Sequence, residues 1–362
     1  MARLNAAASP SQALESGFYV PPPETRSIAA EIAGRLELRP GTTHLVVGGV
    51  GSGKSTELLA AKLQLDRDSE THSVYIDVSK QIDLADFHRS SLGPAIANSL
   101  GQLTYSRNDL PASEVTDLAR KLFELWVGPG ALGYTVEEVM ARYVVALRQQ
   151  APNIVVFVDS LDRLVDAVEF ECAVRDTIPL LCKHDIGFVL VGPLRILYGA
   201  ERSVVDLFDQ FYRKPYYSTA VDGPGIKFLT SVLRKRVPAA LISDTICILL
   251  AIESGGVLRD MIALALAAVE EAYIGGSEMV LARHVEAAVE AFGRKHLIGI
   301  DSEELNILQR VRTQRTFVHT SDKDLALLVT RRVLEYQDSN GKTLYAVHPT
   351  IAPLLKQIAG EP

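Results

Sequence analysis

Two patterns of apolar residues alternate along the first part of the chain. Short runs are apolar throughout, whereas the longer stretches between them repeat apolar residues with a helical period. Uninterrupted apolar runs are typical of strands buried on both faces, and the helical period is typical of amphipathic helices. We therefore predict an α/β fold with a parallel sheet flanked by helices. The predicted strands lie at 44–47, 73–77, 153–159, 187–192 and 216–221, and the predicted helices at 25–36, 84–103, 112–127, 136–149 and 167–184.

The pattern changes near residue 224, where helical periodicity continues without strands to about residue 293. Two further helical patterns then precede two short strand signals, at 333–336 and 343–347, around an Asn-Gly turn. Helices followed by a hairpin are typical of a winged helix. We predict four segments: a loose N-terminal arm at 1–17, an α/β core at 18–222, a helical lid at 223–295 and a winged-helix domain at 296–362.

Composition narrows the class of protein. The 362 residues are 48% hydrophobic and carry a formal net charge of −7, which excludes a mainly disordered chain and does not favour a general polyanion-binding surface. The three cysteines lack metal-type spacing and do not indicate a disulfide framework. No apolar run reaches the length of a membrane-spanning helix. We expect a cytoplasmic protein with no membrane partner.

A glycine-rich loop follows the first predicted strand. Its sequence, GGVGSGKS, fits the pattern G-x-x-x-x-G-K-[ST] and precedes a predicted helix, which is the context that phosphate binding requires. Backbone N–H groups and the helix N-terminus would hold phosphate oxygens, Lys54 would reach the β- and γ-phosphates, and Ser55 would bind Mg²⁺. A plain strand-to-helix turn is the alternative interpretation. The predicted nucleotide-binding residues of this loop are Gly48, Gly49, Val50, Gly51, Ser52, Gly53, Lys54, Ser55 and Thr56.

Two acidic residues, Asp77 and Asp159, end predicted strands, and a phosphate loop needs such a carboxylate on the metal side. Asp159 is the better candidate because the run before it is almost entirely apolar, and we expect it to hold Mg²⁺. Asp162 follows three residues later and is a candidate for orienting or activating the attacking water. Its alternative roles are a helix N-cap or an ion pair with Arg163. We therefore take Lys54, Asp159 and Asp162 as the candidate catalytic residues.

With these residues in place, the chain resembles the P-loop ATPases of the AAA+/STAND group and their relatives among origin-recognition-type initiators. The resemblance extends over nearly the whole chain and is carried by VVFVDSLDR at 155–163, SGGVLRD at 254–260 and YAVHPTIAPLL at 345–355. It implies ATP or ADP with Mg²⁺ as ligands. Further nucleotide contacts follow from it. An extended segment would touch adenine, Arg195 and Arg259 would be sensors, and His348 would touch the nucleotide phosphates. The adenine segment is Tyr19, Val20 and Pro21.

These implied sensors have plainer alternatives. Arg259 is also a candidate lid-surface residue paired with Asp260 or Glu253, Arg195 a plain surface charge, and His348 a packing residue next to Pro349. The position after Asp159 departs from the pattern, since AAA+ enzymes usually have Glu there and this chain has Ser160. We therefore expect slow ATP hydrolysis by the isolated protein.

The resemblance implies an ATP-dependent molecular switch that controls partner binding or self-assembly, in bacterial signalling or anti-phage defence. A protein partner or effector is expected, and self-association into a homo-oligomer stays open. Two alternatives also remain. One is a DNA-binding initiator or loader of the AAA+ class, in which DNA contacts the wing; acidic residues in this region make that less favoured. The other is a subunit whose nucleotide is structural and scarcely hydrolysed.

Overall fold

The structure of the protein, a computed structural model, describes residues 4, 10–23, 27–67, 70–103, 112–128, 134–149, 152–220, 223–319, 321–338 and 340–358. Parts of the predicted arm at 1–17 and the predicted boundary at 222 lie outside these residues. The chain divides into two compact units. The sheet unit comprises Ile28–Val47 and Lys54–Arg213. The C-terminal unit comprises Met1–Ser27, Gly48–Gly53 and Lys214–Pro362.

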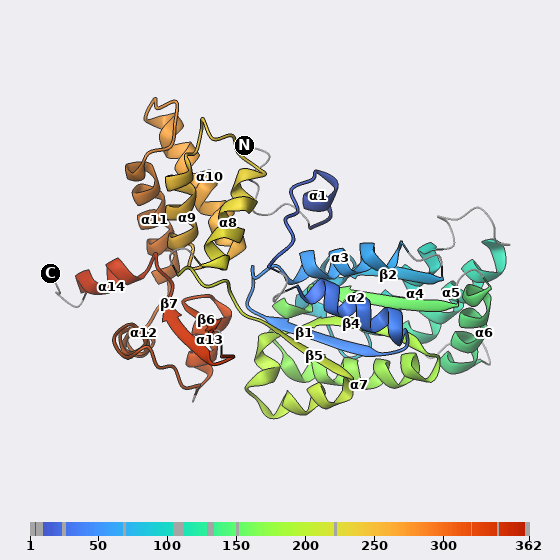
Figure 1. Cartoon of the computed structure of the whole chain (residues 1–362). Coiled ribbons are helices and arrows are strands. Elements are labelled where there is room, and N and C mark those ends of the chain that lie inside the picture. The colour runs from blue at the N-terminus through green and yellow to red at the C-terminus, as the bar shows by residue number, and fades with distance from the viewer. Residues whose placement is uncertain are drawn as a thin grey trace. The chain divides into compact units, whose positions relative to one another are not determined.

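The sheet unit is built on five strands in the order β2-β3-β4-β1-β5 (Figure 1). The pairs β1–β4, β3–β4 and β2–β3 are parallel, which confirms the predicted parallel sheet. In the β2–β3 register, Asp77 lies opposite Asp159, so both carboxyl ends meet at one edge. The strands are β1 (Thr43–Gly48), β2 (Thr71–Asp77), β3 (Asn153–Asp159), β4 (Ile186–Gly192) and β5 (Gln210–Lys214).

Helices cover both faces of this sheet. On one face, α2 and α3 pack against alternate residues of β1, β3 and β4, among them Val46, Phe157 and Val191. The intervening strand residues point to the other face, where Phe170 of α7 lies against Gly192. The α-helices of this unit are α2 (Ile28–Leu38), α3 (Lys54–Leu65), α4 (Leu92–Leu103), α5 (Ala112–Val127), α6 (Val136–Arg148) and α7 (Ala167–Lys183).

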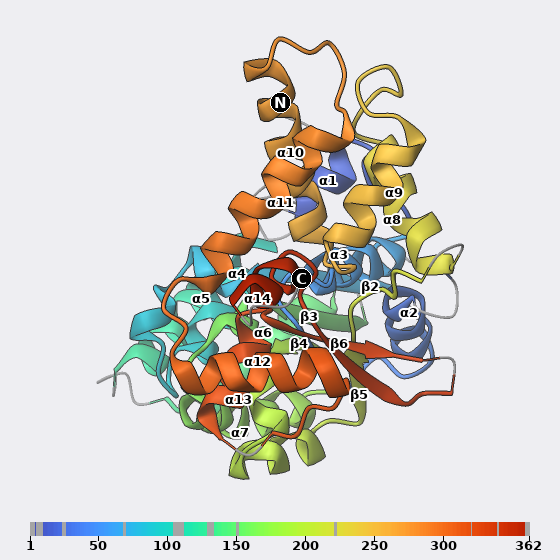
Figure 2. The ribbon, with the colours of Figure 1, turned by 90° about the vertical axis from the view of Figure 1, so that its left-hand side faces the viewer.

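The C-terminal unit contains a helical part and a smaller part with a hairpin (Figure 2). Leu229, Leu250 and Leu264 belong to the apolar core shared by the helices of the first part. In the second part, two helices precede the antiparallel pair β6–β7, in the order that the sequence predicts. The helices of the first part are α8 (Pro224–Arg234), α9 (Asp244–Glu253), α10 (Leu258–Ile274) and α11 (Ala282–Leu297). The second part consists of α12 (Ser302–Gln314), α13 (Asp322–Val329), β6 (Val333–Gln337), β7 (Thr343–Val347) and α14 (Ala352–Ile358), and α1 (Pro10–Glu15) lies near the N-terminus.

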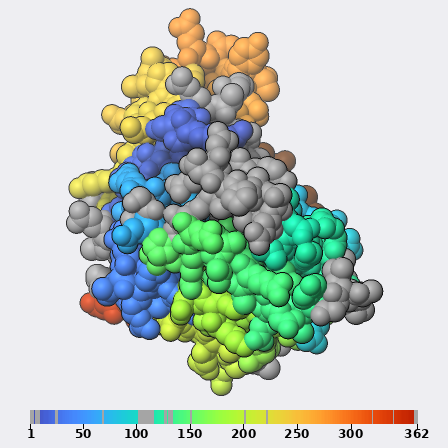
Figure 3. Space-filling model, turned by 90° about the vertical axis from the view of Figure 1, so that its right-hand side faces the viewer, coloured from blue at the N-terminus to red at the C-terminus, as the bar shows by residue number. Residues whose placement is uncertain are grey.

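Two predicted elements differ from the structure. The last strand of the sheet is β5, at Gln210–Lys214, and not 216–221; residue 221 is outside the described part. Pro215 lacks an N–H and cannot continue a ladder, so the strand ends before it. The predicted helix at 84–103 is a short 3₁₀ turn at Leu84–Asp86 followed by α4. By contrast, α5 and α6 match their predicted ranges, and Figure 3 shows them in teal and green at one surface of the sheet unit.

Among the described helices, none combines the length and the apolar character needed to cross a membrane.

Candidate nucleotide-binding site

The glycine-rich loop leaves β1 at Gly48 and enters α3 at Lys54. Gly51 and Gly53 have φ angles of 84° and 96°, which only glycine adopts without strain. These two residues therefore let the backbone turn sharply before the first turn of the helix.

By its contacts, the loop Gly48–Gly53 belongs to the C-terminal unit. The Tyr216 hydroxyl donates a hydrogen bond to the Val50 carbonyl at 3.2 Å. A Cβ atom at Gly49 would overlap that same hydroxyl, so the close approach of Tyr216 requires glycine there. A Cβ atom at Gly51 would lie 2.9 Å from Arg259 Cβ. The structure thus places the predicted lid sensor Arg259, in the first turn of α10, next to the loop.

Ser52 carries an unsatisfied polar group in the middle of this loop. Its side chain is fully buried, and its Oγ has no hydrogen-bond partner among the described residues. Leaving a buried hydroxyl unpaired costs about 1–3 kcal/mol. An orphaned hydroxyl at this position fits a site that a ligand oxygen completes.

Lys54 begins α3 and is almost fully buried. Its Nζ lies 2.8 Å from Asp162 Oδ2, and the two side chains are 2% and 13% exposed. Arg163 is the alternative ion-pair partner that the sequence offers for Asp162, but the structure pairs Asp162 with Lys54. The candidate phosphate-binding ammonium therefore has a carboxylate beside it.

Asp159 ends β3 and is a buried residue, with 2% of its surface exposed. Burial raises its pKa, and the nearby negative charge of Asp162 adds to this, whereas hydrogen bonds from Ser55 and Tyr75 lower it; burial dominates. The Tyr75 hydroxyl donates to Asp159 Oδ2 in a short contact. Ser55 and Asp159 are thus neighbours, as a shared Mg²⁺ would require, and a bound cation would offset the cost of the buried charge.

Ser160 has a second role that the sequence did not reveal. Its Oγ donates to Asp77 Oδ1 at 2.6 Å, and its N–H donates to Asp159 Oδ1 at 2.7 Å. Its backbone is left-handed, with φ 75°, at a cost of roughly 1–2 kcal/mol for a non-glycine residue. Asp77 is recognisable in the sequence as an acid that ends a strand, whereas Tyr75 and the Asp77–Ser160 bond give no signal there. Both depend on the register of β2 against β3.

The remaining predicted contacts are spread over both units. In the sheet unit, Arg195 follows β4 in the 3₁₀ turn Leu194–Leu197 and is partly buried. In the C-terminal unit, Tyr19 and Val20 are partly buried and Pro21 is exposed; Val20 packs against the core of the helical part. Thr56 lies in the first turn of α3.

His348 is enclosed within the C-terminal unit. Its ring is fully buried, and the Thr350 N–H donates to Nδ1 at 3.3 Å, so the neutral ring carries its proton on Nε2. That Nε2 lies 3.5 Å from Asp260 Oδ2, and Arg331 Nε donates to the same oxygen at 2.9 Å. Burial alone would raise the pKa of Asp260, but His348 and Arg331 outweigh it and the pKa is lowered. In this structure His348 joins the hairpin to α10, and its contact with nucleotide stays a prediction.

These residues fit an ATP–Mg²⁺ complex. The loop offers the unpaired hydroxyl of Ser52, and Lys54 offers a buried cation for phosphate. Ser55 and Asp159 offer two adjoining oxygen ligands of the kind that Mg²⁺ prefers.

No protein-family model and no curated protein matches the chain. Among solved structures, the Aeropyrum pernix ORC2 protein, in ADPNP–ADP complexes, is similar with a TM-score of 0.52 at 15% identity, over 94% of this chain and 95% of that one. Cdc6p from Pyrobaculum aerophilum gives 0.48 at 15% identity, over 95% and 98%. RuvB from Thermotoga maritima, a Holliday junction branch migration motor, gives 0.43 at 15% identity, over 95% and 99%. The likeness to ORC2 shows a shared fold, in agreement with the predicted P-loop ATPase fold.

Proposed function

We propose that the protein binds ATP with Mg²⁺ and hydrolyses it slowly. The observation that carries this proposal is the buried Lys54, set directly after the glycine-rich loop and 2.8 Å from the Asp162 carboxylate. A buried ammonium at the start of a helix, next to a loop with positive φ angles, is suited to a polyanionic phosphate chain. The shared fold with an ORC2 protein whose complexes contain ADPNP and ADP supports the choice of adenine nucleotide.

In this proposal, Lys54 leaves Asp162 and binds the β- and γ-phosphates, and Ser52 gives its hydroxyl to a phosphate oxygen. Ser55 and Asp159 hold Mg²⁺, which would neutralise charge that develops on the phosphates. Asp162, released from Lys54, is the carboxylate available to accept a proton from the attacking water as a general base. Arg259, beside Gly51, is the candidate sensor of the γ-phosphate. Arg195, His348 and the segment at 19–21 keep their predicted roles as further contacts.

Lys54→Ala tests the binding proposal. The variant loses a charge-assisted contact worth about 1.5–3 kcal/mol, so ATP affinity should fall by roughly tenfold to more than a hundredfold. Lys62→Ala is the matched control, because Lys62 lies on the same helix but pairs with Asp66 at the surface. Calorimetry with Mg-ATP measures both. Equal affinity in wild type and Lys54→Ala would refute nucleotide binding at this loop, and binding without turnover would favour the structural-nucleotide alternative.

Of the functions that the sequence left open, we favour a DNA-binding initiator or loader. The fold likeness to the ORC2 protein extends over the length of both chains and includes the C-terminal unit, whereas no finding favours signalling or anti-phage defence. In this proposal 223–295 is the lid, and the two helices and hairpin within 296–362 form a winged-helix domain that contacts DNA. ATP would set the arrangement in which the domain binds, with other copies of the chain as candidate partners.

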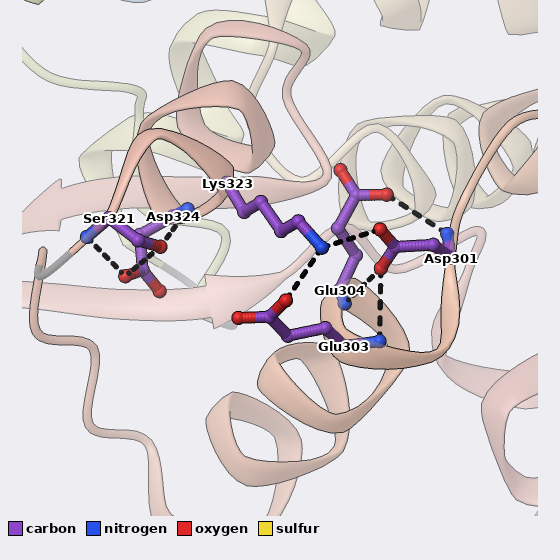
Figure 4. A network of polar contacts seen from close by, with 6 residues as sticks. All are labelled: Asp301, Glu303, Glu304, Ser321, Lys323 and Asp324. Atoms are coloured by element: carbon purple, nitrogen blue, oxygen red, sulfur yellow. Dashed lines mark hydrogen bonds and ion pairs between the residues drawn. The ribbon is translucent and has the colours of Figure 1, made fainter.

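One observation favours a protein partner instead. In helix-turn-helix modules the N-terminal residues of the second helix contact base edges, and here α13 begins with Asp322, Lys323 and Asp324. Lys323 forms ion pairs with two carboxylates: its Nζ lies 2.7 Å from Asp301 Oδ2 and 2.6 Å from Glu303 Oε2 (Figure 4). The start of α13 is therefore acidic and would repel phosphates. A nucleotide-controlled protein switch is accordingly the second candidate function.

Fluorescence anisotropy with a labelled DNA duplex separates the two functions. A loader should bind DNA more tightly with ATP than with ADP, and binding should weaken steeply between about 50 and 200 mM salt. Lys54→Ala should abolish the nucleotide dependence. Absence of DNA binding at low salt in every nucleotide state, together with ATP-dependent self-association in size-exclusion chromatography, would favour the protein switch.

A further inference from the structure

The edge of the sheet next to Asp159 holds a second carboxylate with a defined partner. Asp77 lies opposite Asp159 in the register of β2 and β3. Between them, the buried Ser160 donates its N–H to Asp159 at 2.7 Å and its hydroxyl to Asp77 at 2.6 Å. The candidate Mg²⁺ ligand and Asp77 are therefore joined through one serine.

The bond to Asp77 determines what the Ser160 oxygen can do. A hydroxyl has one proton to donate, and here that proton is committed to the Asp77 carboxylate. The remaining lone pairs of Oγ can only accept. An acceptor beside the metal-binding aspartate is what orients a water molecule for attack on a phosphate.

Two facts weigh against a purely structural role. Asp77 also accepts from Ser79 Oγ at 2.6 Å and lies 3.8 Å from Lys80, so its carboxylate keeps two partners when the Ser160 hydroxyl is removed. Ser160 also keeps a left-handed backbone that glycine would adopt freely. Strain of this kind is concentrated at functional sites, where the side chain itself is required.

We infer that Asp77 is a positioning residue for ATP hydrolysis that acts through Ser160, whose hydroxyl oxygen orients the attacking water. The inference rests on the proposed ATPase function. It adds an acceptor for one hydrogen of the water, separate from Asp162, which pairs with Lys54.

Single-turnover hydrolysis and equilibrium ATP binding, measured on the full chain, test the inference. Ser160→Gly removes the hydroxyl and relieves the backbone strain, so the melting temperature should not fall while the hydrolysis rate drops by roughly 10²-fold, the effect of misplacing a reacting group. Asp77→Asn should lower the rate in the same direction. In both variants the Kd for ATP should stay within about twofold of wild type.

One further variant separates orientation from folding. Ser79→Ala removes the other hydroxyl donor of Asp77 without touching Ser160, and should hydrolyse ATP at nearly the wild-type rate.

The outcomes distinguish the inference from the proposed function. If wild type binds and hydrolyses ATP and both Ser160→Gly and Asp77→Asn retain the wild-type rate, the inference is overturned and the ATPase proposal stands. If the variants hydrolyse ATP more slowly but also bind ATP more weakly and melt at a lower temperature, Asp77 is structural and the inference is likewise overturned. If wild type does not bind ATP at all, the proposed function fails first.

Discussion

At the residue scale, the Lys54 ammonium has two competing anionic partners, the Asp162 carboxylate and the phosphates of the proposed nucleotide. The pair is nearly buried, with side chains 2% and 13% exposed, so its Coulombic attraction is weakly screened. ATP must displace Asp162 to gain Lys54. Asp162 therefore weakens ATP binding in the ground state, and its carboxylate becomes available as a proton acceptor once ATP has displaced it.

Asp162→Asn separates these two effects. Because the amide competes less well for Lys54, we expect ATP affinity to stay the same or to rise by a few fold. Hydrolysis should fall by roughly 10²–10⁴-fold, the usual range for a positioned proton acceptor. Calorimetry and single-turnover hydrolysis measure the two quantities, with Asp176→Asn, which breaks an exposed pair with Arg89, as control. Wild-type hydrolysis in Asp162→Asn would remove Asp162 from the mechanism.

At the element scale, Tyr216 joins the glycine-rich loop to the hairpin within the C-terminal unit. Its hydroxyl donates to Val50, and its backbone N–H donates to the Glu335 carbonyl in β6 at 3.1 Å. Its ring is buried with Val257 and Leu334. A movement of the loop on nucleotide binding would therefore be transmitted through Tyr216 to β6. This connection couples the proposed nucleotide site to the hairpin.

Tyr216→Phe should loosen this connection with little change in packing. One hydrogen bond of about 1 kcal/mol is lost, so we expect the bound nucleotide to dissociate a few fold faster. Tyr336→Phe is the control. Tyr336 packs against the same three residues, but its hydroxyl donates to the Gly255 carbonyl and not to the glycine-rich loop. Stopped-flow release of a fluorescent ADP analogue gives both rates, and identical rates in the two variants would contradict the proposed connection.

The contact of α10 with the residues flanking the hairpin depends on one buried charge. Asp260 is 2% exposed and pairs with Arg331, so Asp260→Asn should lower the free energy of unfolding by roughly 3 kcal/mol. Because the pKa of Asp260 is lowered, its contribution is fully present above the ordinary carboxyl pKa and is lost as the pH falls through the lowered value. The difference in melting temperature between wild type and variant should be full at pH 7 and shrink below about pH 4.

Asp244→Asn provides the comparison for this experiment, since Asp244 is paired with Arg234 but 87% exposed. This substitution should change the free energy of unfolding by no more than about 1 kcal/mol, and the change should be similar at pH 7 and below pH 4. A similar loss in both variants would show that the buried charge is not what holds this part of the unit together.

At the scale of the whole molecule, the sheet and the helices around it were predictable because their signals are local. Strands buried on both faces are apolar throughout, and β3 and β4 show this directly. The edge strand β5, with the sequence QFYRK, mixes polar and apolar residues and gave no such signal. The position of the glycine-rich loop between β1 and α3 was predictable because its motif has a fixed spacing of glycines and lysine. The Tyr75–Asp159 and Asp77–Ser160 bonds could not, because they join residues about 80 positions apart through strand register.

The assignment of Gly48–Gly53 to the C-terminal unit has a consequence for dissecting the protein. The chain enters that unit after Val47 and leaves it again at Lys54, so neither unit is a continuous piece of sequence. A fragment beginning at Lys214 would lack the Val50 carbonyl that accepts from Tyr216, and a fragment ending at Arg213 would carry the loop without its neighbours. Fragments 1–213 and 214–362, made separately, should therefore associate when mixed, and restoring nucleotide binding should require both.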